Sequence, residues 1–169
     1  MHREFLNYSA DKLRQQSGRI ESCLGSLTED QVWARGSENE NAIGNLVLHL
    51  CGNLRQWIVA GVGGVPDIRR RDQEFSARGA VAIPELVDRL RATVAETVEV
   101  LDQVTAERLM DRIVVQKYEQ TVLAAIYHVV EHFSGHTGQI IFATKMLTAS
   151  DLGFYHHLRT TADHREKTP

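Results

Sequence analysis

The sequence predicts an all-α protein, a four-helix bundle with short extra helical turns in the connections. Apolar residues recur at helical spacing through most of the chain, and β-branched residues are scattered rather than alternating as they would in strands. Proline, which interrupts helices, occurs only at positions 66, 84 and 169. The 169 residues are enough for one hydrophobic core. We therefore expect a single domain over residues 1–158, followed by a polar tail at 159–169.

The first helix is indicated by an apolar residue at every seventh position. The residues of this seam are Leu6, Leu13, Ile20 and Leu27, with Ala10, Ser17 and Leu24 on the turns between them. Such a seam is typical of a helix that packs in a bundle. Thr28 and Gln31 then stand at the spacing of a capping box, which predicts a short helical turn after the first helix.

A polar connection separates the second helix from the third. The second helix is expected over 41–61 and ends in a glycine-rich stretch at 61–64. The connection at 65–81 contains three consecutive arginines and is expected to be a loop. Pro84 is a favourable first residue for the third helix. The apolar seam of that helix is Leu86, Leu90, Val94, Thr97, Leu101 and Val104.

A short extended segment is expected at 113–115, and the fourth helix is expected over 121–147. The second and fourth helices both contain very few charged residues. Arg55 is the one charged residue between positions 41 and 65, and Glu131 and Lys145 are the two between 121 and 147. A helix at the surface shows charge on its solvent face. Both helices are therefore expected to be largely buried, in the bundle or at an oligomer contact.

Uncharged polar residues nevertheless form one stripe on each of these two helices. The stripes are Asn45, His49 and Asn53 on the second helix, and His128, His132 and His136 on the fourth, continued by Gln139. Residues four apart lie on one face of a helix, and buried polar groups are costly unless they are satisfied. We therefore expect the two stripes to face each other around an interior site.

Such a site is suited to a metal ion. Imidazole is the commonest metal ligand in proteins, and two histidines four residues apart can hold one ion with a third from a facing helix. His128 and His136 are about 12 Å apart along a helix, too far for one ion. The spacing alone leaves two choices, His128 with His132 or His132 with His136, each together with His49.

The overall composition argues against several classes of partner. The formal net charge is −3, which gives no electrostatic footprint for nucleic acid or an anionic membrane. The most apolar stretch, 43–65, is interrupted by polar residues and does not predict a membrane span. Cys23 and Cys51 do not suggest a disulfide framework, and a cytoplasmic location is expected.

Two stretches carry a family resemblance, NLVLHL at 45–50 and above all HVVEHFSGHTGQI at 128–140. They resemble the DinB/YfiT-like superfamily of metal-binding four-helix bundles, and 52–57 and 151–155 resemble a branch of mostly unassigned function. The resemblance implies a homodimer with a divalent metal, most often Ni²⁺ or Zn²⁺, with Fe²⁺ and Mn²⁺ as further candidates. It implies metal ligands at His49, His132 and His136. The residues then expected around them are His128, Asn45, Asn53, Glu131 and Gln139.

Several relatives in this superfamily are thiol S-transferases. The resemblance thus favours a metal-dependent transferase that activates a low-molecular-weight thiol, or water, towards a small-molecule substrate. Arg69, Arg70 or Arg71 would bind carboxylates of the thiol. Two alternatives stay open. A metal-dependent hydrolase is one, because residues 128–132 match H-x-x-E-H with Glu131 as the base. A non-enzymatic metal-binding or stress-response module is the other.

Overall fold

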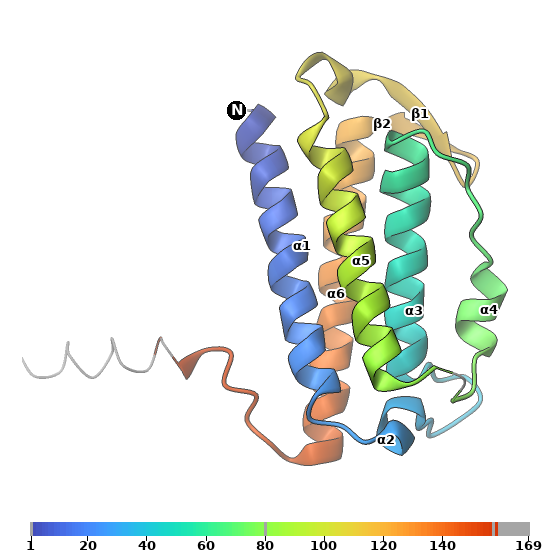
Figure 1. Ribbon diagram of the computed structural model, residues 1–169, viewed down its shortest axis with the longest axis vertical. Coiled ribbons are helices and arrows are strands. Elements are labelled where there is room, and N and C mark those ends of the chain that lie inside the picture. Colours follow the sequence, from blue (N-terminus) through green and yellow to red (C-terminus); the bar gives the residue numbers. More distant parts are fainter. Residues whose placement is uncertain (1, 80, 157, 159–169) are drawn as a thin grey trace, which may run out of the picture.

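Four long helices pack side by side in the computed structural model (Figure 1), which describes residues 2–79, 81–156 and 158. The long helices are α1 (His2–Leu24), α3 (Ile43–Leu54), α5 (Ile83–Asp102) and α6 (Val122–Thr148). The helix α3 continues into η1 (Arg55–Val62), which has the wider turn of a π-helix. The predicted fold class is thus confirmed, and the tail expected at 159–169 lies outside the described residues.

Short elements occupy the connections between the long helices. They are α2 (Glu29–Trp33), α4 (Arg71–Ser76), the 3₁₀ helix η2 (Glu107–Met110), and the strands β1 (Arg112–Val115) and β2 (Tyr118–Thr121). The strands form an antiparallel hairpin in which Val115 stands opposite Tyr118. The extended segment expected at 113–115 is therefore one strand of this hairpin. The prediction of a loop at 65–81 was wrong in one respect, because this connection contains the helix α4.

Capping side chains set the starts of two helices. The Thr28 hydroxyl accepts a hydrogen bond from the Gln31 amide, and the Gln31 side chain accepts one from the Thr28 amide (2.9 Å), so the predicted capping box before α2 is confirmed. Thr121 caps α6 in the same way, by accepting from the amide of Ala124. Both contacts are local, and the first of them was predicted from the sequence.

The core of the bundle is made by the apolar seams. All of the predicted seam residues of the first and third helices are buried. The helix α3 packs against α5, α6 and the short helices α4 and α2, and every residue from Ile43 to Cys51 is buried. The lack of charge on this helix therefore follows from its burial in the bundle.

The helix α6, by contrast, buries one face and exposes the other. The exposed face carries apolar side chains that are between 39% and 71% exposed, namely Leu123, Tyr127, Phe142 and Met146. Burial within this chain thus does not account for the missing charges of α6. The oligomer contact stays a prediction.

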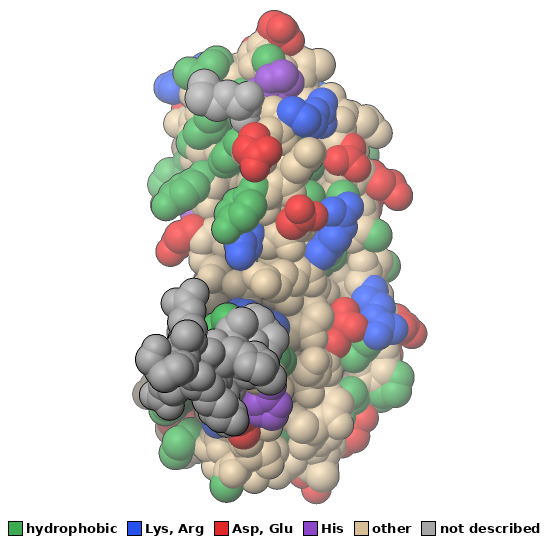
Figure 2. Space-filling view, turned by 90° about the vertical axis from the view of Figure 1, so that its left-hand side faces the viewer, with side chains coloured by type: hydrophobic (Ala, Val, Ile, Leu, Met, Phe, Trp, Pro, Cys, Tyr) green, Lys and Arg blue, Asp and Glu red, His purple; other side chains and the backbone are tan. Residues whose placement is uncertain are grey.

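Charge is mixed in sign on the surface that Figure 2 presents. Basic and acidic side chains lie interspersed on that face, with hydrophobic side chains between them. Within the described part of the chain, no helix is both long enough and apolar enough to cross a lipid bilayer.

We predict that neither cysteine reacts readily in the native protein. Both thiols are buried, and burial raises the pKa of Cys51 to about 12 and that of Cys23 above its usual value. The thiolate is the nucleophile, so Ellman's reagent at pH 8 should react at least about 100-fold more slowly with native protein than with protein in guanidinium chloride. Rapid release of one equivalent of thionitrobenzoate from native protein would contradict this expectation.

Candidate metal centre

The two polar stripes meet where α3 packs against α6, and three imidazole rings come together there. The ring centroids of His49 lie 5.0 Å from those of both His132 and His136, and the centroids of His132 and His136 lie 4.5 Å apart. Each ring therefore contacts the other two. His49 is buried, and the two histidines of α6 are partly buried.

The nitrogen atoms of these rings lie near the spacing that one metal ion requires. Nε2 of His49 and Nε2 of His132 are 3.1 Å apart, and one nitrogen from each of the three rings lies within 4.8 Å of the others. Two imidazole nitrogens that bind one tetrahedral zinc ion at its usual bond length are about 3.3 Å apart. The three rings could hold a divalent ion with small movements of the side chains.

In His49 and His136, a hydrogen-bond acceptor lies next to Nδ1. A proton on Nδ1 leaves the lone pair on Nε2, the nitrogen that would bind an ion. With a proton on Nδ1, His49 donates to Oε2 of Glu74 (3.1 Å), and His136 donates to Oε1 of Gln139 (2.7 Å). Hydrogen bonds of this kind fix the tautomer and the orientation of a metal-binding histidine. Nη2 of Arg69 also lies 3.0 Å from Nδ1 of His49. Since both of those nitrogens carry hydrogens in this tautomer, Glu74 is the partner.

Glu74 is itself held by Arg69. Nε of Arg69 donates to Oε1 and Nη2 to Oε2, both at 2.7 Å, and Nη1 donates to Gln56 at 2.8 Å. The side chain of Arg69 is only 3% exposed. Burial alone would raise the pKa of Glu74, but the hydrogen bonds and charge of Arg69 together with those of His49 outweigh it and lower the pKa. Glu74 is therefore a carboxylate at neutral pH.

Two residues of α3 allow this ion pair to dock. A Cβ atom at Gly52 would lie 1.9 Å from Oε1 of Glu74, so only glycine leaves room for the carboxylate. The side-chain amide of Asn45 donates to the carbonyls of Glu74 (2.8 Å) and Ala77 (3.1 Å). Asn45, expected beside the imidazoles, thus fastens α4 to α3 and positions Glu74 through its backbone.

The surroundings of His132 and His136 lower the pKa of both imidazoles and so favour their neutral forms. Burial, and then the neighbouring rings of His136, His49 and His128, lower the pKa of His132 to about 3. Burial also lowers the pKa of His136, although its hydrogen bond to Gln139 opposes the shift. Neutral imidazole is the form that binds metals.

The other residues expected near the site lie in different surroundings. The ring of His128 packs on Trp57, with centroids 4.5 Å apart, and its centroid is 5.7 Å from that of His132. Glu131 is exposed. Asn53 is buried, and within the described residues neither its Oδ1 nor Nδ1 of His132 has a hydrogen-bond partner. The structure thus groups His132 with His136, not with His128, around His49.

Glu74 was not predicted from the sequence, and the sequence did not distinguish among the roles of Arg69, Arg70 and Arg71. Arg69 is buried in the ion pair, so the suggestion that it binds a substrate carboxylate was wrong. Arg71 lies over the ring of Phe75 (4.7 Å), which in turn packs on His49 (4.8 Å between centroids). Arg71 is therefore separated from His49 by the ring of Phe75, whereas Arg69 lies directly behind His49.

Three solved structures share this fold at low sequence identity. A conserved protein from Enterococcus faecalis aligns with a TM-score of 0.70 and 19% identity, over 85% of this chain and 97% of that chain. A DinB-like protein from Bacillus subtilis gives 0.67 and 17%, over 88% and 97%. Another from Bacillus cereus gives 0.62 and 14%, over 78% and 85%. At these identities the likeness shows the fold alone, which is DinB-like.

No curated protein matches this sequence significantly. A family match covers nearly the whole chain, residues 1–157, and includes all three clustered histidines. The chain therefore belongs to the family described as "Protein of unknown function (DUF1572)".

Proposed function

We propose that this protein is a metal-dependent enzyme in which His49, His132 and His136 hold one divalent ion, Ni²⁺ or Zn²⁺, for transfer of a low-molecular-weight thiol to a small electrophile. The observation that carries the proposal is the convergence of three imidazoles, two of which have Nδ1 within hydrogen-bond distance of Glu74 and Gln139. Such a constellation presents Nε2 lone pairs and is a recurrent ligand set for catalytic ions.

The chemistry follows from the charge of the ligand set. Three neutral ligands leave the ion its full charge and open positions, at which a thiol or water loses its proton near neutral pH. Glu74 holds the ring of His49 in the orientation that presents Nε2 to the ion. Arg71, which lies over the ring of Phe75 next to His49, supplies a guanidinium for a carboxylate of the thiol substrate.

Hydrolysis through activated water at the same ion is the second candidate. The H-x-x-E-H form of that idea is poorly supported, because Glu131 is exposed and His128 packs on Trp57. A hydrolase at this site would use the pair His132 and His136 instead.

Metal analysis of the purified protein tests the ligand set. We expect about one divalent ion per chain in the natural protein by inductively coupled plasma mass spectrometry, little in His136→Ala, and unchanged content in the matched variant His128→Ala. Circular dichroism should show that all three are folded, because the apolar seams and not the ion hold the bundle together. Loss of metal from His128→Ala with retention in His136→Ala would overturn the assignment, as would a metal-free natural protein.

Replacing Glu74 tests the support behind His49. In Glu74→Gln the amide is a poorer acceptor for Nδ1, and we expect metal affinity to fall by about 10- to 100-fold. The exposed Glu131→Gln is the control and should bind metal normally. In Gly52→Ala the added Cβ displaces the carboxylate without removing it, and affinity should fall in the same direction. Equal affinities in all of these proteins would show that Glu74 does not act on the site.

A turnover assay tests the transferase itself. Metal-loaded protein should consume monobromobimane with glutathione, bacillithiol or mycothiol faster than chelated protein does, and His136→Ala should lose the difference. Arg71→Ala should raise KM for the thiol and leave kcat nearly unchanged. If metal binds and no thiol is consumed, the transferase proposal fails while the metal site stands.

A further inference from the structure

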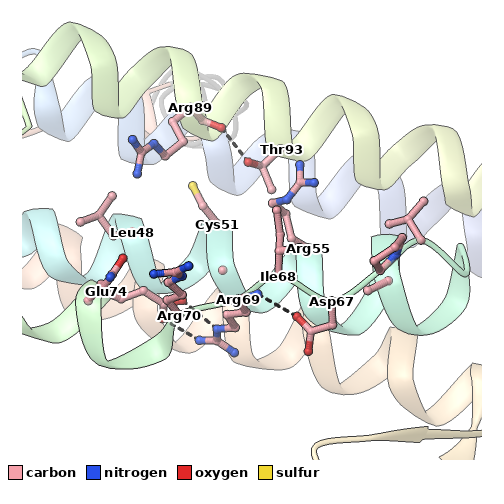
Figure 3. Close-up of a pocket in the computed structure, with 15 residues that line it drawn as sticks. Leu48, Cys51, Arg55, Asp67, Ile68, Arg69, Arg70, Glu74, Arg89 and Thr93 are labelled. Atoms are coloured by element: carbon pink, nitrogen blue, oxygen red, sulfur yellow. Dashed lines mark hydrogen bonds and ion pairs between the residues drawn. The ribbon is translucent and has the colours of Figure 1, made fainter.

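A second cavity lies on the far side of α3 from α6. It has a volume of about 310 Å³ and opens between α3, α5 and the connection that leads to α4 (Figure 3). Arg69 and Glu74 line it, and the same Glu74 contacts His49. The ion pair therefore forms a wall between this cavity and the three imidazoles.

One part of the cavity lining is apolar. Leu48 and Cys51 from α3 form its base, and Val65, Pro66 and Ile68 from the connection form its edge. Ile68 is 72% exposed and Val65 is 45% exposed. Apolar side chains at the edge of a cavity are a typical feature of a binding site, since a ligand removes them from water.

The charged part of the lining contains one unmatched cation. Figure 3 shows Arg55, Arg70 and Arg89 around the opening. Arg55 pairs with Glu96, and Arg89 pairs with Glu85. The Arg70 guanidinium, by contrast, makes no hydrogen bond or ion pair with any of the described residues.

The two acids of the lining do not neutralise Arg70. Both oxygens of Glu74 are bonded to Arg69. Asp67 accepts hydrogen bonds from the side chain of Gln56 (2.7 Å) and from the backbone amide of Arg69 (3.0 Å). Neither carboxylate is hydrogen-bonded to Arg70, so the Arg70 guanidinium is available to a ligand next to the apolar part of the lining.

We propose that this cavity binds a small organic anion whose carboxylate pairs with Arg70 and whose apolar body lies against Leu48, Val65 and Ile68. The volume is at the small end of the range of ligand pockets, about 300 to 1,000 Å³, which matches a ligand the size of an aryl acetate. The guanidinium offers two parallel N–H donors that match the two oxygens of a carboxylate, a geometry that an alcohol or an ammonium group cannot reproduce.

Titration with phenylacetate tests this site in the full-length protein. The titration is followed by ligand-observed NMR. It is run on protein as purified and on protein from which metal has been removed. The comparison distinguishes binding of the carboxylate to a metal ion from binding in the cavity. We expect the metal-free protein to bind phenylacetate at least about tenfold more tightly than 2-phenylethanol or phenethylammonium. Equal binding of the three probes, or none of phenylacetate at about 20 mM, would overturn the proposal.

Two neighbouring arginines provide a matched pair of variants. Arg70→Ala should weaken phenylacetate binding by about tenfold. Arg71→Ala should leave it unchanged, because Arg71 lies over Phe75 and does not line the cavity. Ile68→Ser should weaken phenylacetate binding and leave acetate binding unaffected. Equal affinities of Arg70→Ala and Arg71→Ala would refute the role of Arg70. None of these results depends on the metal, so the site can fail or succeed independently of the proposed enzyme.

Discussion

The buried ion pair of Arg69 and Glu74 is the interaction on which the arrangement of the site depends. Removing two charges from water is costly, and it is tolerated only where the groups are fully bonded to each other and to neighbours. Here both carboxylate oxygens and all three guanidinium nitrogens have partners. The pair joins the connection before α4 to α3. Its carboxylate, that of Glu74, contacts Nδ1 of His49. Losing one member would leave the other buried and uncompensated, so the connection, the imidazole and the second cavity share one support.

The sequence predicts the bundle well and the site in part, because some contacts join residues close together in the chain and others join residues far apart. Seams, caps and the spacing of His132 and His136 are local, so periodicity reveals them. Spacing alone left the pairing of His132 open, and in the structure His132 and His136 cluster with His49 while His128 packs on Trp57. Glu74 could not be predicted. It stands 25 residues from His49 in the chain, and its approach depends on the space at Gly52, a tertiary contact with no local pattern.

The two hydrogen bonds behind the imidazoles have different origins. Gln139 is three residues after His136 on the same helix, so their contact exists as soon as α6 forms. The contact of His49 with Glu74 exists only after the connection has docked on α3. One imidazole of the cluster is thus oriented by secondary structure and another by tertiary structure. Changes in the connection would act on the site through His49 rather than through His136.

The exposed apolar face of α6 and two of the clustered imidazoles belong to the same helix, so contacts at one can act on the other. The helix that carries His132 and His136 also exposes Tyr127, Phe142 and Met146 to water. Any partner that covered these side chains would restrict the motion of the helix that supplies two of the three rings. Free-energy coupling is reciprocal, so a partner that tightened ion binding would itself be held more tightly when the ion is present. Association measured with and without metal would then report one coupling energy from two directions.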